Sequence, residues 1–211
     1  MTRPILYDYP RSTACYRVRI ALNLKGVAYE TVRVGLLESE QKSEAYRARN
    51  PQGLVPMLEA GDLRLTQSLA IADWLDHQHC EPRLLPADAA DRAHVLALAL
   101  AVACDIHPLN NLRVLKYLSG PLELDQAARD GWYRHWIREG FAALEALAAP
   151  RAGRFLFGDA PTLADICLVP QMYSARRFEV PVDDFPLLVA ADAAANQLDA
   201  FAAAHPDRAA T

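Results

Sequence analysis

The sequence has few cysteines for its 211 residues, and none of the four belongs to a recognisable pair. They stand alone at Cys15, Cys80, Cys104 and Cys167. This spacing matches neither a CxxC motif nor a small disulfide framework. Cys104 and Cys167 lie in apolar helical stretches, so we expect both to be unreactive core thiols. Isolated thiols are typical of the reducing cytoplasm, where we expect the protein to be located.

Long apolar runs, a strong net charge and a metal-ligand pattern are also missing. The longest apolar stretch, 95–104, is too short to cross a bilayer, and the first residues lack the apolar core of a signal peptide. A net charge of −4 argues against non-specific binding to nucleic acid. His77, His79 and Cys80 have no further ligand at metal-binding spacing. We therefore expect no metal, no membrane and no nucleic acid as partners.

Residues 1–80 alternate between strand and helix signals, which predicts an α/β domain. The predicted elements are strands at 5–7, 29–34, 55–59 and 63–66 and helices at 18–24, 41–49 and 69–75. Strand 29–34 alternates apolar and polar residues, as a half-buried strand does. Ser68 is the expected N-cap of helix 69–75. The order β-α-β-α-β-β-α indicates a mixed sheet.

Strand signals end at a linker, 81–86, which carries two prolines. We therefore predict a second, all-α domain over 87–211. Its helices include 88–106, which looks apolar on most sides, and 185–204. Another helix shows one face made of Trp132, Trp136, Phe141, Leu144 and Leu147. Thr162 and Asp165 form a capping-box pattern at the start of a further helix.

The most informative segment joins the first strand to the first helix through Arg11, Ser12 and Thr13. This turn places a guanidinium group, two hydroxyls and unpaired backbone N–H groups at a helix N-terminus. The helix dipole is positive there, so the site favours an anion.

Several motifs resemble the zeta class of the soluble glutathione transferases. The segment 11–22 is similar to the class signature Ser-Ser-Cys-x-x-Arg-Val-Arg-Ile-Ala-Leu. Residues 50–56 and 67–71 are similar to the family's glutathione-binding stretch, and 104–113, 168–171 and Arg177-Phe178 resemble the helical half of maleylacetoacetate isomerases. The resemblance covers nearly the whole chain. It implies a thioredoxin-like α/β N-terminal domain, an all-α C-terminal domain and a homodimer.

One departure from the family pattern concerns the signature cysteine, which is replaced by Ala14. The thiol lies one position later, at Cys15, and therefore points about 100° further round the helix. We expect Cys15 to pack inside the helix and not to inherit the family cysteine's role. The reactive sulfur would then belong to reduced glutathione, the cofactor that the resemblance implies.

By family position, several residues are expected to bind glutathione. Val55, before a cis-proline, would pair through its backbone with the cysteine portion, while Gln67 and Ser68 would bind the γ-glutamyl carboxylate at a helix N-terminus. Ser68 can also serve simply as a cap. The other expected contacts are Gln41, His107, Asn111 and Arg113. Taken alone, His107 is as easily explained as a packed histidine beside Pro108.

Ser12 is the expected activator of the glutathione thiol. A charge-assisted hydrogen bond from its hydroxyl would lower the pKa of the thiol by about one to two. The helix dipole would lower that pKa by less than about one. Thr13 could share or replace this role, and either residue could instead be only the N-cap.

Arginines near that thiol favour a small dicarboxylate as substrate. Arg11, Arg17 and Arg177 are the expected carboxylate-binding residues, because guanidinium groups bind carboxylates bidentately. Arg11 and Arg177 would also stabilise negative charge during the reaction. The alternative is that Arg17, Arg19 and Arg176 lie on solvated faces.

The resemblance implies cis–trans isomerisation of maleylacetoacetate to fumarylacetoacetate, a step in tyrosine and phenylalanine breakdown. The thiolate would add to the alkene, allow rotation, and leave again. Maleylpyruvate isomerisation, general zeta-class transfer and dehalogenation of small haloacids remain alternatives. A more distant alternative is a non-enzymatic binding module with the same fold.

Overall fold

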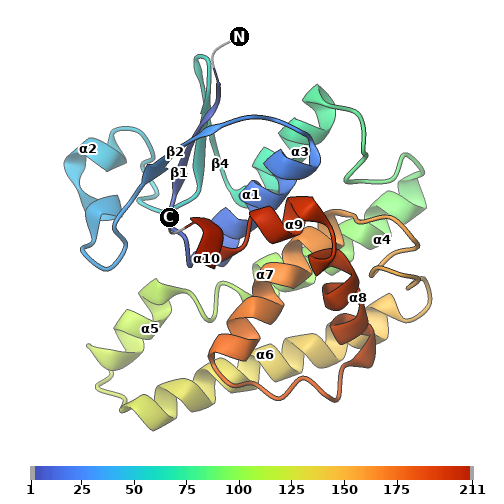
Figure 1. The fold of residues 1–211 in the computed structure, drawn as a ribbon. Coiled ribbons are helices and arrows are strands. Elements are labelled where there is room, and N and C mark those ends of the chain that lie inside the picture. The colour runs from blue at the N-terminus through green and yellow to red at the C-terminus, as the bar shows by residue number, and fades with distance from the viewer. Residues whose placement is uncertain (1–2, 210–211) are drawn as a thin grey trace. The chain divides into compact units, whose positions relative to one another are not determined.

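A four-stranded mixed sheet organises the first part of the chain in the computed structural model, which describes residues 3–209 (Figure 1). The strands lie in the order β2 (Glu30–Arg33), β1 (Ile5–Asp8), β3 (Met57–Ala60) and β4 (Leu63–Thr66). The central strand β1 pairs in parallel with β2 and antiparallel with β3, and β3 and β4 form the predicted hairpin. Because β1 and β2 are parallel, their carboxyl ends meet at the same edge of the sheet.

Helices complete the predicted β-α-β-α-β-β-α order, which is confirmed. Helix α1 (Thr13–Leu24) follows β1 and contacts α3 (Ser68–Gln78), which follows β4. Between β2 and β3 the chain forms only a 3₁₀ turn, η1 (Glu40–Lys42), and one turn of helix, α2 (Glu44–Arg47). The helix predicted at 41–49 is therefore much shorter than expected.

The end of the chain belongs to the same compact unit as the sheet. This first unit runs to Leu84 and takes in the chain from Gln197 onward, including α9 (Asp199–Ala203) and α10 (Pro206–Ala209). Asn23 of α1 donates a hydrogen bond to the carbonyl of Ala200 at 3.0 Å. The predicted domain division, 1–80 and 87–211, stays a prediction. The compact units differ from it because the segment from Gln197 groups with the first unit.

Strand β2 is more exposed than its sequence pattern predicts. All four of its residues are exposed, and Val32 keeps 41% of its surface accessible. The expectation of a half-buried strand was wrong because β2 is an edge strand. The apolar residue that does become buried is Val34, just after the strand, which packs with Tyr7, Tyr46 and Met57.

A buried guanidinium group joins the sheet, the first turn and the end of the chain. Arg19 of α1 donates hydrogen bonds to the Asp8 carboxylate at 2.6 Å, to the Pro10 carbonyl at 2.9 Å and to the Ala204 carbonyl at 3.0 Å. Only 2% of Arg19 is exposed. The alternative that it lies on a solvated face is therefore wrong, because its three partners replace the water that a guanidinium group requires.

The second unit, Leu85–Asn196, contains helices only, together with one isolated bridge between Ala152 and Gly158. Its elements are α4 (Ala89–Leu100), the π-helical η2 (Ala101–Ile106), α5 (Leu112–Ser119), α6 (Gln126–Ala148), α7 (Leu163–Arg177) and α8 (Pro186–Asn196). No helix within residues 3–209 is long and apolar enough to cross a membrane.

Two helices of this unit differ from the prediction. The helical path 88–106 is continuous but changes to π geometry after Leu100, and α4 buries only Val95, Leu98 and Ala99. The helix is therefore not buried on most sides, although its residues are largely apolar. The helix predicted at 185–204 ends at Asn196, where the chain leaves the second unit.

The buried face of α6 agrees with the predicted face at Phe141 and Leu144 and lies one residue further along the helix at the other positions. Its fully buried positions are Tyr133, Ile137, Phe141, Leu144 and Ala148, whereas Trp132 and Trp136 are only half-buried and Leu147 is exposed. Contact with η2 requires a glycine in α6. A Cβ atom on Gly140 would lie 2.2 Å from Cγ1 of Ile106.

The capping box at the start of α7 is confirmed. The hydroxyl of Thr162 accepts a hydrogen bond from the backbone N–H of Ala164, and the Asp165 carboxylate accepts one from the N–H of Thr162 at 2.8 Å. The same carboxylate accepts a hydrogen bond from the N–H of Leu156 at 2.9 Å. Burial raises the pKa of Asp165, against the opposing effect of these hydrogen bonds.

Two glycines of α6 provide a matched test of this packing. Gly140→Ala places a methyl group against Ile106, so we expect the free energy of unfolding to fall by about 1–3 kcal/mol. Gly131 has no atom near its missing Cβ, and Gly131→Ala should raise that free energy by about 0.5–1 kcal/mol. Urea unfolding of both variants is the measurement. Equal effects of the two substitutions would contradict the close contact between α6 and η2.

Candidate functional site

Ser12 caps the N-terminus of α1. Its Oγ accepts a hydrogen bond from the N–H of Cys15 at 3.2 Å, and its own N–H donates to the Tyr9 carbonyl at 2.9 Å. Ser12 is half-buried, whereas Thr13, the first residue of the helix, is buried. A hydroxyl carries one donor and two acceptor positions. Capping uses an acceptor position, so the Ser12 hydroxyl can also donate to an anionic sulfur.

Cys15 is a packed thiol, as predicted. It is completely buried, and burial raises its pKa well above the usual value, with the Asp8 charge adding to the effect and a Ser12 hydrogen bond opposing it. A protonated, buried thiol is a poor nucleophile. The prediction that Cys167 is buried is also confirmed, but Cys104, in η2, is exposed.

The loop before β3 is held from two sides at the Leu54 carbonyl. The Tyr46 hydroxyl donates to this oxygen at 2.7 Å and the Asn50 amide donates to it at 2.8 Å. The following peptide bond, Val55–Pro56, is cis. These two donors fix the backbone next to Val55, the residue expected to pair with a peptide ligand. The sequence motifs included Asn50 but gave no reason to select Tyr46.

A buried acceptor without a partner lies beside this loop. Gln41 of η1 is buried, and its Oε1 has no hydrogen-bond partner among residues 3–209. Gly53 holds the loop close to it: its φ is 59°, and a Cβ there would lie 2.8 Å from the Gln41 carbonyl oxygen. Burying an unpaired polar atom is costly. A ligand with an amide or ammonium donor would satisfy Gln41, so this residue fits a peptide such as glutathione.

The start of α3 is positively polarised, and its first helical residue, Ser68, is buried. Gln67 occupies the N-cap position with φ of 68° and makes no side-chain cap, so the expectation that Ser68 is the N-cap was wrong. Ser68 is the first helical residue, and its Oγ lies 3.4 Å from Nη1 of Arg17. The Arg17 guanidinium is thus buried inside the first unit, not on a solvated face. Unpaired first-turn N–H groups and a guanidinium group together suit a carboxylate.

Arg11 lies on the surface directly before Ser12 and lines a pocket of about 270 Å³. Arg33 at the end of β2 lines the same pocket. Arg33 was not selected from the sequence. The signal was present, however, because the carboxyl ends of two parallel strands meet at one edge of a sheet, and Arg11 and Arg33 follow or end those strands.

The remaining predicted residues lie in the second unit. Asn111 is the N-cap of α5 and accepts a hydrogen bond from the N–H of Arg113 at 3.1 Å, while Arg113 itself is exposed. His107 is half-buried at the end of η2. Arg177 ends α7 and is exposed, with its guanidinium 4.9 Å from the Phe178 ring centroid. Their expected contacts with glutathione and substrate stay predictions.

Neighbouring side chains fix the end of α7 that carries Arg177. The Phe178 ring stacks on Tyr133 with 3.7 Å between centroids, and Arg134 donates a hydrogen bond to the Phe178 carbonyl at 3.1 Å. The Tyr133 hydroxyl lies 2.6 Å from Oγ of Ser174. Helix α6 therefore holds Arg177's backbone in place while leaving its side chain exposed.

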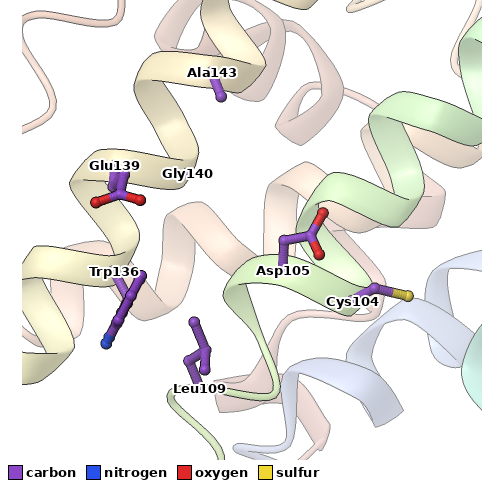
Figure 2. Close-up of a pocket in the computed structure, with 7 residues that line it drawn as sticks. All are labelled: Cys104, Asp105, Leu109, Trp136, Glu139, Gly140 and Ala143. Atoms are coloured by element: carbon purple, nitrogen blue, oxygen red, sulfur yellow. The ribbon is translucent and has the colours of Figure 1, made fainter.

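The second unit also contains a pocket of about 420 Å³ between η2 and α6 (Figure 2). Figure 2 shows the two sources of its lining: Cys104, Asp105 and Leu109 on one side, and Trp136, Glu139, Gly140 and Ala143 of α6 on the other. The lining has two carboxylates and no arginine, lysine or histidine. Its charge is therefore opposite to what a dicarboxylate requires.

Comparison with known proteins assigns both parts of the chain. The family model described as "Glutathione S-transferase, N-terminal domain" matches residues 6–83, and "Glutathione S-transferase, C-terminal domain" matches 126–196. Maleylpyruvate isomerase of Ralstonia sp is 53% identical over 95% of this chain and 96% of its own length. Maleylacetoacetate isomerase of Rhizobium meliloti is 52% identical over 97% of each chain.

Solved structures agree with these relatives. The holo structure of a bacterial maleylpyruvate isomerase, described as a zeta-class glutathione S-transferase, matches with a TM-score of 0.95 and 52% identity over 97% of each chain. A maleylacetoacetate isomerase of Methylobacterium extorquens AM1, solved with bound malonate and glutathione, matches with a TM-score of 0.91 and 40% identity over 97% of each chain. The predicted two-part fold is thereby confirmed.

Tyr46→Phe tests how the Leu54 carbonyl is held. Burial raises the pKa of Tyr46 to about 12 from the usual 10. The unfolded chain therefore ionises first, and the stability that Tyr46 contributes is complete below pH 10 and is lost as pH rises towards 12. We expect Tyr46→Phe to cost about 1 kcal/mol at pH 7.

Urea unfolding at several pH values is the measurement. The difference in the free energy of unfolding between the wild type and Tyr46→Phe should become smaller above pH 10. Asn50→Ala serves as the comparison, because it removes the other donor to the same carbonyl without removing a titrating group. If the difference in the free energy of unfolding between the wild type and Tyr46→Phe stayed constant from pH 9 to 12, the raised pKa of the buried Tyr46 phenol would be contradicted.

Proposed function

The chain belongs to the zeta-class glutathione transferase family, and on that premise we propose that it is a glutathione-dependent cis–trans isomerase of small unsaturated diacids. The substrate we propose first is maleylacetoacetate, which would place the reaction in tyrosine and phenylalanine breakdown. Maleylpyruvate is the second candidate, favoured by the 53% identity to the Ralstonia maleylpyruvate isomerase. The observation that carries the proposal is a half-buried Ser12 hydroxyl at a helix N-terminus beside exposed Arg11.

Residues of the first unit would hold glutathione. Ser68 and Gln67, at the start of α3, would bind its γ-glutamyl carboxylate, with the buried Arg17 guanidinium adding positive charge behind Ser68. The Val55 backbone would pair with its cysteine portion, and the unpaired Oε1 of Gln41 would accept a hydrogen bond from one of its N–H groups. Bound glutathione supplies the thiolate that adds reversibly to the alkene of the substrate.

Ser12 would keep the sulfur ionised. Its hydroxyl donates the hydrogen bond, and the N–H groups of the first turn of α1 add the positive end of the helix dipole. Thr13 is less suited to this role because it is buried as the first residue of the helix. Because Cys15 is buried and protonated, it does not compete as the nucleophile.

Arg11 and Arg177 would bind the carboxylates of the substrate. Both side chains are exposed, and a guanidinium group keeps its charge at any physiological pH. They would also stabilise the negative charge that develops on the carbonyl oxygen next to the alkene. His107, Asn111 and Arg113 are proposed as further glutathione contacts from the second unit.

The donor role of Ser12 predicts a specific change in Ser12→Ala. The pKa of the bound glutathione thiol, followed by thiolate absorbance, should rise by about one to two, and turnover of both diacids at pH 7 should fall about tenfold or more. Thr13→Ala should change the pKa less. Thr162→Ala is the matched control, because it removes a hydroxyl N-cap from α7 without touching the proposed site.

Maleylacetoacetate and maleylpyruvate should be assayed side by side in this experiment, since their ratio identifies the preferred diacid. An unchanged thiol pKa in Ser12→Ala would exclude Ser12 as the donor. A folded wild-type protein that binds glutathione but converts neither diacid would overturn the isomerase proposal and favour the binding module.

We also propose that the chain forms a homodimer. One side of α4 and η2 exposes Ala93, Ala97, Leu100 and Cys104, and this spacing defines a single helical face. Covering such a face with a second copy removes apolar surface from water. Sedimentation velocity should give a dimer for the wild type and a shift towards monomer for Leu100→Asp. A monomeric wild type at micromolar concentration would reject the proposal.

A further inference from the structure

A pocket in the first unit contains two arginines, of which only Arg11 has a proposed role. Its volume is about 270 Å³, and it is lined by Tyr9, Pro10, Arg11, Arg33, Leu37, Pro206 and Asp207. Three parts of the chain thus meet here: the turn before α1, the end of β2 with the loop after it, and α10. Figure 1 shows α10 close to the ends of β1 and β2.

The two guanidinium groups are not neutralised by the fold. Within residues 3–209, the side chain of neither Arg11 nor Arg33 forms a hydrogen bond or an ion pair. Asp8 is the residue opposite Arg33 in the β1–β2 ladder, but its buried carboxylate binds Arg19 at 2.6 Å. That carboxylate is therefore unavailable to Arg33.

Asp207 is the only acidic residue in the lining, and most of its side chain is exposed to water. Its carboxylate also lies 3.6 Å from Nδ1 of His205. Two permanent positive charges therefore face one solvated negative charge, so the pocket attracts anions. Its other walls are apolar, from Pro10, Leu37 and Pro206. Positive groups above apolar walls suit a carboxylate carried on a short carbon chain.

The position of the pocket relative to Ser12 indicates which part of a substrate would bind in it. Arg11 directly precedes Ser12, the proposed donor to the sulfur, but Ser12 itself is not in the lining. The pocket therefore lies beside the reacting centre. It would receive the end of the substrate that is remote from the alkene.

We propose that Arg33, together with Arg11, binds the carboxylate at the remote end of the substrate and makes this chain selective for diacids over monoacids. This inference rests on the proposed function and adds a substrate-binding residue to it. Arg33 lies on an exposed edge strand, so replacing it removes the charge while leaving the core intact.

The test combines a substitution with a change of substrate. Arg33→Ala is compared using the diacid and its monoacid analogue, in which a methyl ketone replaces the arm that ends in the second carboxylate. We expect kcat/KM to fall about tenfold more for the diacid than for the monoacid, the factor for one charge-assisted hydrogen bond. Arg33→Lys should recover part of the loss, since it keeps the charge but not the bidentate geometry.

Arg64→Ala is the matched control. Arg64 carries the same charge on β4, the opposite edge strand, and contacts Glu59 at 3.4 Å outside the pocket. It should change kcat/KM for the two substrates equally. Equal losses for diacid and monoacid in Arg33→Ala, or no loss in either, would overturn the proposal.

Calorimetry with malonate and acetate separates this inference from the proposed function. Malonate should bind the glutathione-loaded wild type more tightly than acetate does, and Arg33→Ala should remove about tenfold of that preference. If the wild type converts neither diacid but Arg33→Ala still weakens malonate binding, the isomerase proposal fails and the carboxylate pocket stands. If Arg33→Ala binds malonate as the wild type does, the pocket proposal fails whatever the activity.

Discussion

The buried contact between Arg19 and Asp8 is the constraint on which the first unit depends. One guanidinium group holds the end of β1, the Pro10 carbonyl in the following turn, and the Ala204 carbonyl near the end of the chain. Losing one partner of a buried ion pair costs about 3–5 kcal/mol, because the other charge is left without water. The turn is therefore fixed at both sides, which sets the direction of Ser12 and Arg11.

The same constraint explains how an acidic chain can offer a basic site. The net charge is −4, but Asp8, the acidic residue that precedes the turn in the sequence, is paired inside the fold with Arg19. Arg11 and Arg33, with the solvated Asp207, then set the local potential at the pocket. Electrostatic attraction of a diacid depends on this local arrangement rather than on the total charge.

The order of the elements was predictable from the sequence because strands and helices have different apolar spacing. The predictions that were wrong concern features that depend on neighbours distant in the sequence. Strand β2 has the alternation of a half-buried strand, yet its place at the sheet edge leaves it exposed. Part of the face of α6 was misplaced by one residue because two large tryptophans suggested burial, whereas Tyr133 and Ile137 are the buried residues, and Tyr133 contacts Ser174 of α7.

The residues of the candidate site also fall into two groups: those that a local sequence motif predicts and those that depend on distant neighbours. Residues near Ser12 and Ser68 could be found because local motifs mark helix N-termini. Arg33, Tyr46 and the burial of Arg17 could not be found that way, since each acts through a partner eight or more residues away or through a strand pairing. The apolar residues around Cys104 in the sequence also suggested burial, but the residues that η2 buries are Val102 and Ile106, and Cys104 is exposed.

The bond from Arg19 to Ala204 spans 185 residues, and this has a consequence for how the protein is made. During synthesis the sheet and α1 leave the ribosome well before residue 204, so the Arg19 guanidinium group lacks its last acceptor until Ala204 has been made. The unit that begins first is thus finished last, after the helical unit between its two parts has had time to form. Such distant contacts slow folding, so the wall of the pocket that Pro206 contributes forms later than the sheet beside it.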